Sequence, residues 1–389
     1  MGRFSLSFLQ ILVWAGMALG VAAPVPAWSQ NTFGGTGTVF VPYANAATNP
    51  NLAASPSVNV GFNSSGRYTP FTMDTGSVGI VATRDAFQPA PEAQNLGLGQ
   101  QYFSSSGNIE NGTWWSSKES IYDASGKLVA TADVPVLQVT SRACAPNARS
   151  CRPSKHPTGV ALMGIGFARE SRQQPRGKPA YNAFLNLTSV ATSGGAPQPL
   201  PGGWRNGYVV TASGVYLGLD GANTQHAGFV KLRPNPAYST PTLPEWMPAP
   251  MTVSVNGVSG TGTVLMDTGV GIAYLTPPVG SSVGPLAACP STGLRQCAPN
   301  GTVVTLYLPD QSAPVAVYSF VVGQSDNPLR PDDVVMVNGS AVLLNTRRHF
   351  LGGFDLIYDE ADGFVGYRWT GNASGARGGM NAAADVALP

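Results

Sequence analysis

The chain has 389 residues, of which 43% are hydrophobic and 11% are charged, and its formal net charge is +2. A balance this close to neutral provides neither the basic field that nucleic-acid binding requires nor an acidic tail. At roughly 150 residues per domain the length favours two domains. The 47 Gly and 33 Pro, spread between short runs rich in Val, Thr and Tyr, favour an all-β chain.

The beginning of the chain has the pattern of a secretory signal peptide. One basic residue, Arg3, precedes an apolar run from Phe8 to Val21, and Ala27-Trp28-Ser29 forms a small-x-small cleavage site, although a cut after Ala23 also fits. The apolar run is shorter than the roughly 20 residues that a membrane span needs. We therefore predict a signal peptide at residues 1–29 and an exported protein, periplasmic or secreted, without membrane association after cleavage.

A predicted hairpin leads to the first candidate site residue. The segment from Ser57 to Phe62 alternates in polarity, a turn follows at Asn63-Ser64-Ser65-Gly66, and the chain returns from Tyr68 to Met73. The return strand ends at Asp74-Thr75-Gly76-Ser77. An Asp at such a junction is held rigidly, and the glycine allows backbone N–H groups to point at the carboxylate.

A second hairpin is predicted directly after the first. One strand runs from Gln100 to Ser105, the turn lies near Ser106-Gly107-Asn108, and the return strand passes through Trp114 to Tyr122.

The first motif has a near-copy at Met266-Asp267-Thr268-Gly269-Val270, which follows another hairpin-like segment that begins at Met251 to Val258. A second pair of similar segments, Ala161-Leu162-Met163-Gly164 and Phe350-Leu351-Gly352, follows the two Asp residues at similar distances. Similarity over so long a period predicts two homologous lobes rather than a solenoid, whose repeats run about 20–50 residues.

The four cysteines form two close pairs, Cys144 with Cys151 and Cys289 with Cys297. In an exported chain this spacing predicts two local disulfides, although three connectivities are formally possible. A zinc site is the alternative, but no Cys-x-x-Cys occurs and His156 is the only nearby histidine. We therefore expect no metal site.

The two Asp-Thr-Gly motifs and their apolar-apolar-Gly partners resemble those of the bilobal pepsin-like aspartic proteases, and Phe350 to Tyr367 is similar to that family's closing segment. The resemblance covers nearly all of the mature chain. It implies two homologous, β-barrel-like lobes with a cleft between them. We place the N-terminal lobe, with the first motif, at 30–200, the C-terminal lobe, with the second, at 201–370, and a flexible tail at 371–389. Because no long basic segment follows the signal peptide, we expect no inhibitory prosegment.

The resemblance implies an aspartic endopeptidase whose catalytic residues are Asp74 and Asp267. Two carboxyl groups in contact cannot both ionise cheaply, so the pair shares one proton and activates a water for general acid–base hydrolysis. Four residues of the two turns support the carboxylates by resemblance, through a hydroxyl bond across the lobe interface or a backbone N–H: Thr75, Thr268, Gly76 and Gly269.

The two turns differ at the residue after the glycine. By resemblance, the hydroxyl of Ser77 would bond the outer oxygen of Asp74 and help to keep it ionised. Val270 occupies the matching position and has no hydroxyl. We therefore expect Asp267 to lack this support, so that the pair is asymmetric and Asp267 is more easily protonated than it would be beside Ser or Thr. The sequence does not fix which Asp acts as acid and which as base.

In this family the second hairpin is the flap that closes over substrate, with a Tyr near its tip. Here Ser104 aligns best with that position, and Tyr102 is the nearest Tyr before Gly107. Trp114 is an alternative aromatic wall, or an ordinary strand residue. The flap and substrate-binding candidates are therefore Tyr102, Ser104, Gly107 and Trp114.

Other chemistry finds little support. The three histidines, His156, His226 and His349, lie beside no Gly-x-Ser-x-Gly elbow, and no phosphate-binding loop follows a strand. We interpret the chain as a monomeric endopeptidase for extended peptide or protein substrates, with apolar side chains favoured beside the cut and no cofactor. The alternative is a catalytically silent protein of the same fold that binds a protein or carbohydrate. A processing enzyme for a single partner is a third possibility.

Overall fold

The computed structural model describes residues 33–371, except 64, 147, 149, 170–176, 193, 241, 292, 294, 326 and 328, together with 376–378. The predicted signal peptide, residues 1–29, and most of the predicted tail, residues 371–389, lie outside the described residues. Within that tail, β25 (Ala376–Gly378) pairs with β20 (Ala316–Val321).

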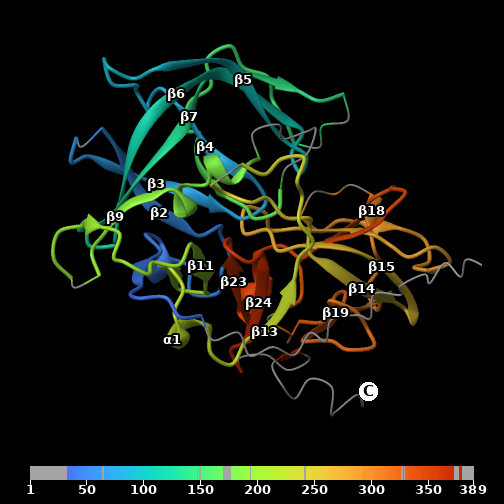
Figure 1. Ribbon diagram of the computed structural model, residues 1–389. Coiled ribbons are helices and arrows are strands. Elements are labelled where there is room, and N and C mark those ends of the chain that lie inside the picture. Colours follow the sequence, from blue (N-terminus) through green and yellow to red (C-terminus); the bar gives the residue numbers. More distant parts are fainter. Residues whose placement is uncertain are drawn as a thin grey trace, which may run out of the picture.

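The described residues are mainly β-structure in three sheets, as Figure 1 shows, so the all-β prediction is confirmed. Helical segments are short, and no helix in the described ranges is long and apolar enough to cross a membrane. These segments are α1 (Gly221–Thr224) and the 3₁₀ turns η1 (Ala46–Thr48), η2 (Pro179–Tyr181), η3 (Ala183–Leu185) and η4 (Arg348–Gly352).

The largest sheets take their strands from separate parts of the chain. The nine-stranded sheet contains β2 (Ser57–Phe62), β3 (Tyr68–Asp74), β4 (Val78–Thr83), β5 (Asn95–Phe103), β6 (Asn108–Tyr122), β7 (Leu128–Cys144), β8 (Ala161–Ile165), β9 (Leu187–Val190) and β10 (Gln198–Pro199). The ten-stranded sheet contains β20, β25 and β14 (Pro250–Val255), β15 (Val258–Leu265), β16 (Ala273–Thr276), β17 (Ala287–Ala288), β18 (Arg295–Cys297), β19 (Val303–Leu308), β21 (Val334–Met336) and β22 (Val342–Asn345).

A third sheet, of six strands, joins the two ends of the described chain. It lies below and between the larger sheets in Figure 1. Its order is β1-β12-β11-β23-β24-β13, so it draws strands from both sides of the lobe boundary expected near residue 200. Its strands are β1 (Val39–Pro42), β11 (Gly207–Val210), β12 (Gly214–Leu217), β13 (Gly228–Lys231), β23 (Phe354–Asp359) and β24 (Phe364–Trp369).

The two larger sheets share a repeated topology. Six neighbouring strands of one, β7-β4-β8-β3-β2-β6, correspond in order to β21-β16-β22-β15-β14-β19 of the other. In both sets the first pair and the third pair are parallel. The remaining neighbours are antiparallel in both. The internal duplication expected from the two Asp motifs is therefore present in the strand order, and β3 and β15 each lead into one of those motifs.

The structure corrects one of the expected repeat segments. The first, at 161–164, lies in β8, but its counterpart in the second sheet is β22 rather than Phe350-Leu351-Gly352. The latter belongs to η4, where Phe350 is fully buried and stacks on Phe354 with ring centroids 4.7 Å apart. The apolar residues of this segment therefore pack in the core. The true counterpart, β22, ends at Asn345 and contains no glycine that would reveal it in the sequence.

The predicted second hairpin is formed by β5 and β6, and β6 also pairs with β7 along most of its length. The hairpin is thus part of a three-stranded ribbon. Its turn rests on the loop closed by the Cys144–Cys151 disulfide, where Ser150 N–H donates to the Ser106 carbonyl at 3.1 Å. Gly107 has a φ of 84°, and a Cβ there would lie 2.4 Å from Ala148 Cα, so the turn requires glycine.

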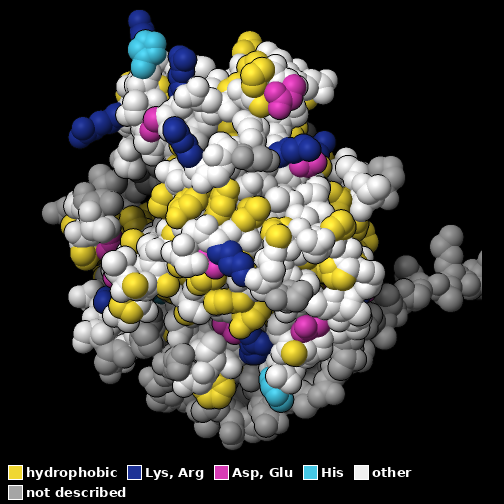
Figure 2. All heavy atoms as spheres, turned by 90° about the vertical axis from the view of Figure 1, so that its left-hand side faces the viewer, with side chains coloured by type: hydrophobic (Ala, Val, Ile, Leu, Met, Phe, Trp, Pro, Cys, Tyr) yellow, Lys and Arg dark blue, Asp and Glu magenta, His cyan; other side chains and the backbone are white. Residues whose placement is uncertain are grey.

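Charged side chains are sparse on the surface in view in Figure 2. Lys and Arg stand singly or in small groups among uncharged side chains on that face. A continuous basic field is therefore absent from the described residues in this view, which agrees with the low charge content of the sequence.

Trp114 belongs to the core under the hairpin ribbon. It is completely buried among Val81, Leu137 and Val139, and its ring meets that of Tyr181 edge-on at 5.1 Å between centroids. A large side chain in such a position contributes to stability through packing and the exclusion of water.

We predict that Trp114→Ala lowers the free energy of unfolding by about 3–5 kcal/mol, because a buried Trp leaves a cavity that the sheet cannot fill. Trp369, whose exposed fraction is 42%, provides a matched control. Trp369→Ala should cost at most about 1 kcal/mol. Urea unfolding of both variants measures the difference, and equal losses would contradict the assignment of Trp114 to the core.

Candidate active site

The first Asp-Thr-Gly motif forms a turn at the end of β3. The carboxylate of Asp74 accepts the N–H of Gly76 at 2.7 Å through Oδ1 and the hydroxyl of Ser77 at 2.5 Å through Oδ2. Its exposed fraction is only 6%. The resemblance assigned both of these donors, and the structure places them where it predicted.

The second motif follows β15 and holds Asp267 in a comparable way. Oδ1 accepts the N–H of Gly269 at 3.0 Å, and Oδ2 accepts the side-chain amide of Asn345 at 2.7 Å. The expectation that Asp267 lacks a second donor is therefore wrong. Val270 supplies no hydroxyl, but β22 runs parallel to β15 and ends with Asn345 beside the carboxylate.

The threonines of the two turns exchange hydrogen bonds. The N–H of Thr75 donates to Thr268 Oγ1 at 3.1 Å, and the N–H of Thr268 donates to Thr75 Oγ1 at 3.0 Å. Each hydroxyl then donates across to the other motif: Thr268 to the Met73 carbonyl at 2.8 Å, and Thr75 to the Met266 carbonyl. Both threonines are buried, so this double exchange fixes one turn against the other.

Each carboxyl group lies against the glycine of the opposite turn. A Cβ on Gly76 would lie 2.4 Å from Asp267 Cγ, and a Cβ on Gly269 would lie 2.5 Å from Asp74 Oδ1. Glycine is therefore required at both positions for close approach rather than for an unusual backbone conformation. The two carboxyl groups are therefore brought close to each other, each packed on the glycine of the opposite turn.

The surroundings of Asp267 raise the pKa of its carboxyl group. Burial, and then the negative charge of Asp74, raise the pKa of Asp267 from 3.8 to about 8. The hydrogen bond from Asn345 and the positive charge of Arg169 oppose this rise. Asp267 therefore holds a proton over a wide pH range, and the causes are burial and the neighbouring Asp74.

Arg169 also belongs to the site, although no motif in the sequence marks it. Its Nε donates to the Gly76 carbonyl at 3.0 Å, and its side chain lines the cavity that contains both Asp residues. The only sequence signal is its position a few residues after β8, the strand that pairs with β3.

The carboxyl groups lie in a cavity of about 630 Å³, with the tip of the β5–β6 hairpin along one side. Tyr102 and Ser104 line this cavity, as expected of the flap candidates, and Tyr274 from β16 donates its hydroxyl to the Ser105 carbonyl at 3.3 Å. Gly107 forms the turn against the disulfide loop instead. Trp114 lies in the core and not among the lining residues, so its role as an aromatic wall is corrected.

A second cavity, of about 610 Å³, lies along the nine-stranded sheet around Leu96, Ser116 and Lys118. None of the predicted site residues lines it. The chemistry that the sequence indicates is therefore concentrated in the cavity with the paired Asp residues.

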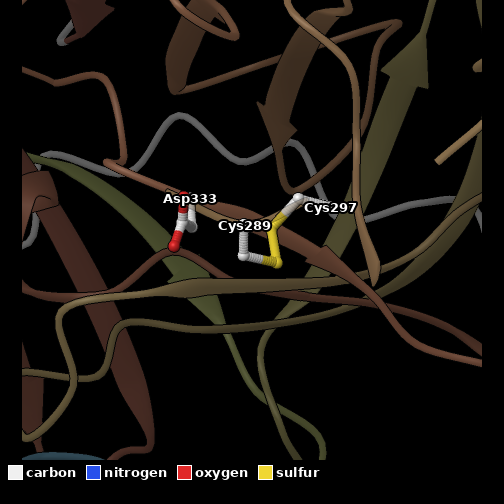
Figure 3. A group of neighbouring side chains, drawn as sticks. All are labelled: Cys289, Cys297 and Asp333. Atoms are coloured by element: carbon white, nitrogen blue, oxygen red, sulfur yellow. A yellow bond between two sulfur atoms is a disulfide. The ribbon is translucent and has the colours of Figure 1, made fainter. Parts of the chain in front are cut away.

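Both predicted disulfides are formed, Cys144 with Cys151 and Cys289 with Cys297. The second lies beside the buried carboxylate of Asp333, as Figure 3 shows, and the three ligand atoms are within 4.8 Å of one another. Because both sulfurs belong to the S–S bond, they are not thiolate ligands. Asp333 instead accepts the N–H of Ser291 at 3.0 Å.

Neither a scan of protein-family models nor a search of curated proteins finds a match to this chain. The site is therefore interpreted from its own geometry and from the resemblance of its motifs.

We predict that the stability difference between the wild type and Asp267→Asn changes with pH. The folded pKa of about 8 exceeds the ordinary value of 3.8, so the proton stabilises the fold at low pH, and this stabilisation is lost as the pH rises from about 4 to about 8. The wild type should lose up to about 1.4 kcal/mol per pH unit relative to the variant in this window. Urea unfolding at several pH values tests this, and parallel profiles would contradict it.

Proposed function

We propose that this chain is an exported aspartic endopeptidase with the bilobal pepsin-like fold, which cleaves extended peptide or protein substrates as a monomer. One observation carries the proposal: two Asp-Thr-Gly turns, on sheets of repeated topology, are locked together so that their carboxyl groups meet in one cavity. Peptide hydrolysis by a proton-sharing pair requires this arrangement of carboxyl groups.

The different environments of the two Asp residues assign their roles in this proposal. Asp267, with its raised pKa, carries the shared proton and donates it to the carbonyl oxygen of the scissile peptide. Asp74 acts as the base that takes a proton from the attacking water. The hydroxyl of Ser77 and the N–H of Gly76 stabilise its negative charge. No covalent intermediate is formed.

A common alternative role for an Asp before small residues is to cap its own turn. Asp310 illustrates this role, because its carboxylate accepts hydrogen bonds from Ser312 and Ala313 of the same turn. Asp74 and Asp267 differ from it because both are buried and each also packs against the opposite turn. Burial of two mutually repelling carboxyl groups costs free energy, which favours a catalytic role over a structural one.

Export is supported by the signal-peptide pattern and by the two disulfides, which persist in oxidising compartments. The protein would therefore meet its substrates in the periplasm or outside the cell.

We predict that Asp74→Asn and Asp267→Asn each reduce cleavage of a denatured protein at least about 100-fold, because each removes one partner of the proton transfer. Asp310→Asn is the matched control and should retain wild-type activity. Product formation is measured from acidic to neutral pH, with and without a statine-type transition-state inhibitor.

Inhibition of the wild type by the statine compound should parallel the loss in the two variants. If the folded wild-type protein cleaves nothing at any pH, the endopeptidase proposal fails, and a binding protein of the same fold replaces it.

A further prediction concerns Asn345. Its amide donates to Asp267 Oδ2 and so favours the ionised carboxylate. Asn345→Leu removes this hydrogen bond at similar volume, so the pKa of Asp267 should rise. The alkaline limb of the pH–rate profile should then move to higher pH, whereas Asn256→Leu in an exposed turn should leave the profile in place. If Asn345→Leu leaves the pH–rate profile unchanged, Asn345 does not influence the catalytic pair.

A further inference from the structure

The inner face of the hairpin ribbon carries a row of polar side chains. Gln101, Glu110 and Arg142 occupy directly paired positions on β5, β6 and β7. Paired residues on neighbouring strands project from the same face of a sheet, so the three side chains form one cross-strand row. Glu110 and Arg142 line the cavity that contains the two Asp residues.

Glu110 has only one of its two carboxylate oxygens paired. Oε1 accepts Arg142 Nε at 2.6 Å, whereas Oε2 is buried without a hydrogen-bond partner among the described residues. The exposed fraction of Glu110 is 1%. An unpaired buried oxygen of a carboxylate is costly, so a donor brought to it by a ligand would be favourable.

A second unpaired acceptor lies on the same strand. Asn108 also lines the cavity, and its Oδ1 is buried without a partner among the described residues. Asn108 and Glu110 are two positions apart on β6, so their side chains project from the same face. The wall of the cavity therefore contains two buried acceptors without partners among the described residues, one of which is charged, and one buried donor, Gln101 Nε2, stands without a partner at the position paired with Glu110.

The chemistry of this wall selects among substrate side chains. An apolar side chain would leave both oxygens unpaired, and an acidic one would meet the charge of Glu110. A lysine ammonium carries three N–H donors and a positive charge, so it matches a wall with a charged acceptor and a neutral acceptor. Burial raises the pKa of Glu110, and Arg142, bonded to Oε1, opposes this rise. A cation bound at Oε2 would lower the pKa in the same way.

We propose that Asn108 and Glu110 form a subsite for the ammonium group of a lysine side chain of the substrate. This inference rests on the proposed endopeptidase function and defines its substrate class. It departs from the apolar preference that the resemblance implied, and the difference arises from residues on β6.

The test uses a peptide that the wild-type protein cleaves. Each position flanking the cut is replaced in turn by Lys, norleucine, Arg or Glu, and kcat/KM is measured for every peptide. At one position the wild type should prefer Lys to norleucine by about tenfold, as expected for one charge-assisted hydrogen bond, with Glu the poorest. The Arg peptide shows whether the subsite distinguishes a compact ammonium from a guanidinium group.

Two variants change this preference in opposite directions. Glu110→Gln should bring the ratio of Lys to norleucine close to one, whereas Arg142→Gln should increase it, because the second carboxylate oxygen becomes free. The ratio is insensitive to a general loss of activity or of folded protein. Glu92→Gln, at an exposed residue outside this cavity, is the matched control and should keep the wild-type ratio.

The outcomes distinguish this inference from the function on which it rests. Cleavage with a ratio near one at every position, or a ratio that Glu110→Gln leaves intact, overturns the lysine subsite and leaves the endopeptidase standing. If no peptide is cleaved, the endopeptidase proposal fails. Calorimetry with uncleavable statine peptides that contain Lys or norleucine then decides the subsite, and equal affinities overturn it.

Discussion

The hydrogen-bond exchange between Thr75 and Thr268 is the interaction on which the rest of the site depends. Each hydroxyl accepts the backbone N–H of the other threonine and donates to a carbonyl of the opposite strand end. All of these groups are buried, so separation of the turns would leave several polar atoms unpaired, at about 1–3 kcal/mol each. The two halves of the chain therefore meet in one register, and that register sets the position of both carboxyl groups.

Close contact between the turns explains the electrostatics of the site. Each carboxyl group packs on the opposite glycine, in a place where any larger residue would collide with it. Water is largely excluded there, and two negative charges would repel strongly, so one proton remains bound to Asp267. Arg169 partly offsets this repulsion from a position that the carbonyl of Gly76 fixes. The fixed position of the two turns and the raised pKa of Asp267 thus have the same cause, the close contact between the turns.

Sequence reasoning succeeded where the signal is local. The hairpins before and after Asp74, the donors Gly76 and Ser77, and both disulfides follow from residues close together in the chain, and the structure contains all of them. It failed where long-range strand pairing decides. Asn345 reaches Asp267 only because β22 runs beside β15, and Trp114 is buried because residues of β4, β7 and η2 surround its ring. No spacing in the sequence specifies these registers.

The two halves meet the same requirement with different residues. Each carboxylate needs one donor from its own turn and one more for its outer oxygen. Ser77 supplies the second from the same turn, whereas Asn345 supplies it from a parallel neighbouring strand. The outer oxygen of each carboxylate receives a hydrogen bond in both halves, but the donor comes from a different residue in each. The sequences of the two halves therefore differ here, although the hydrogen bond is repeated. The difference also gives each carboxyl group its own surroundings, and the proposed division of the pair into an acid and a base rests on this asymmetry.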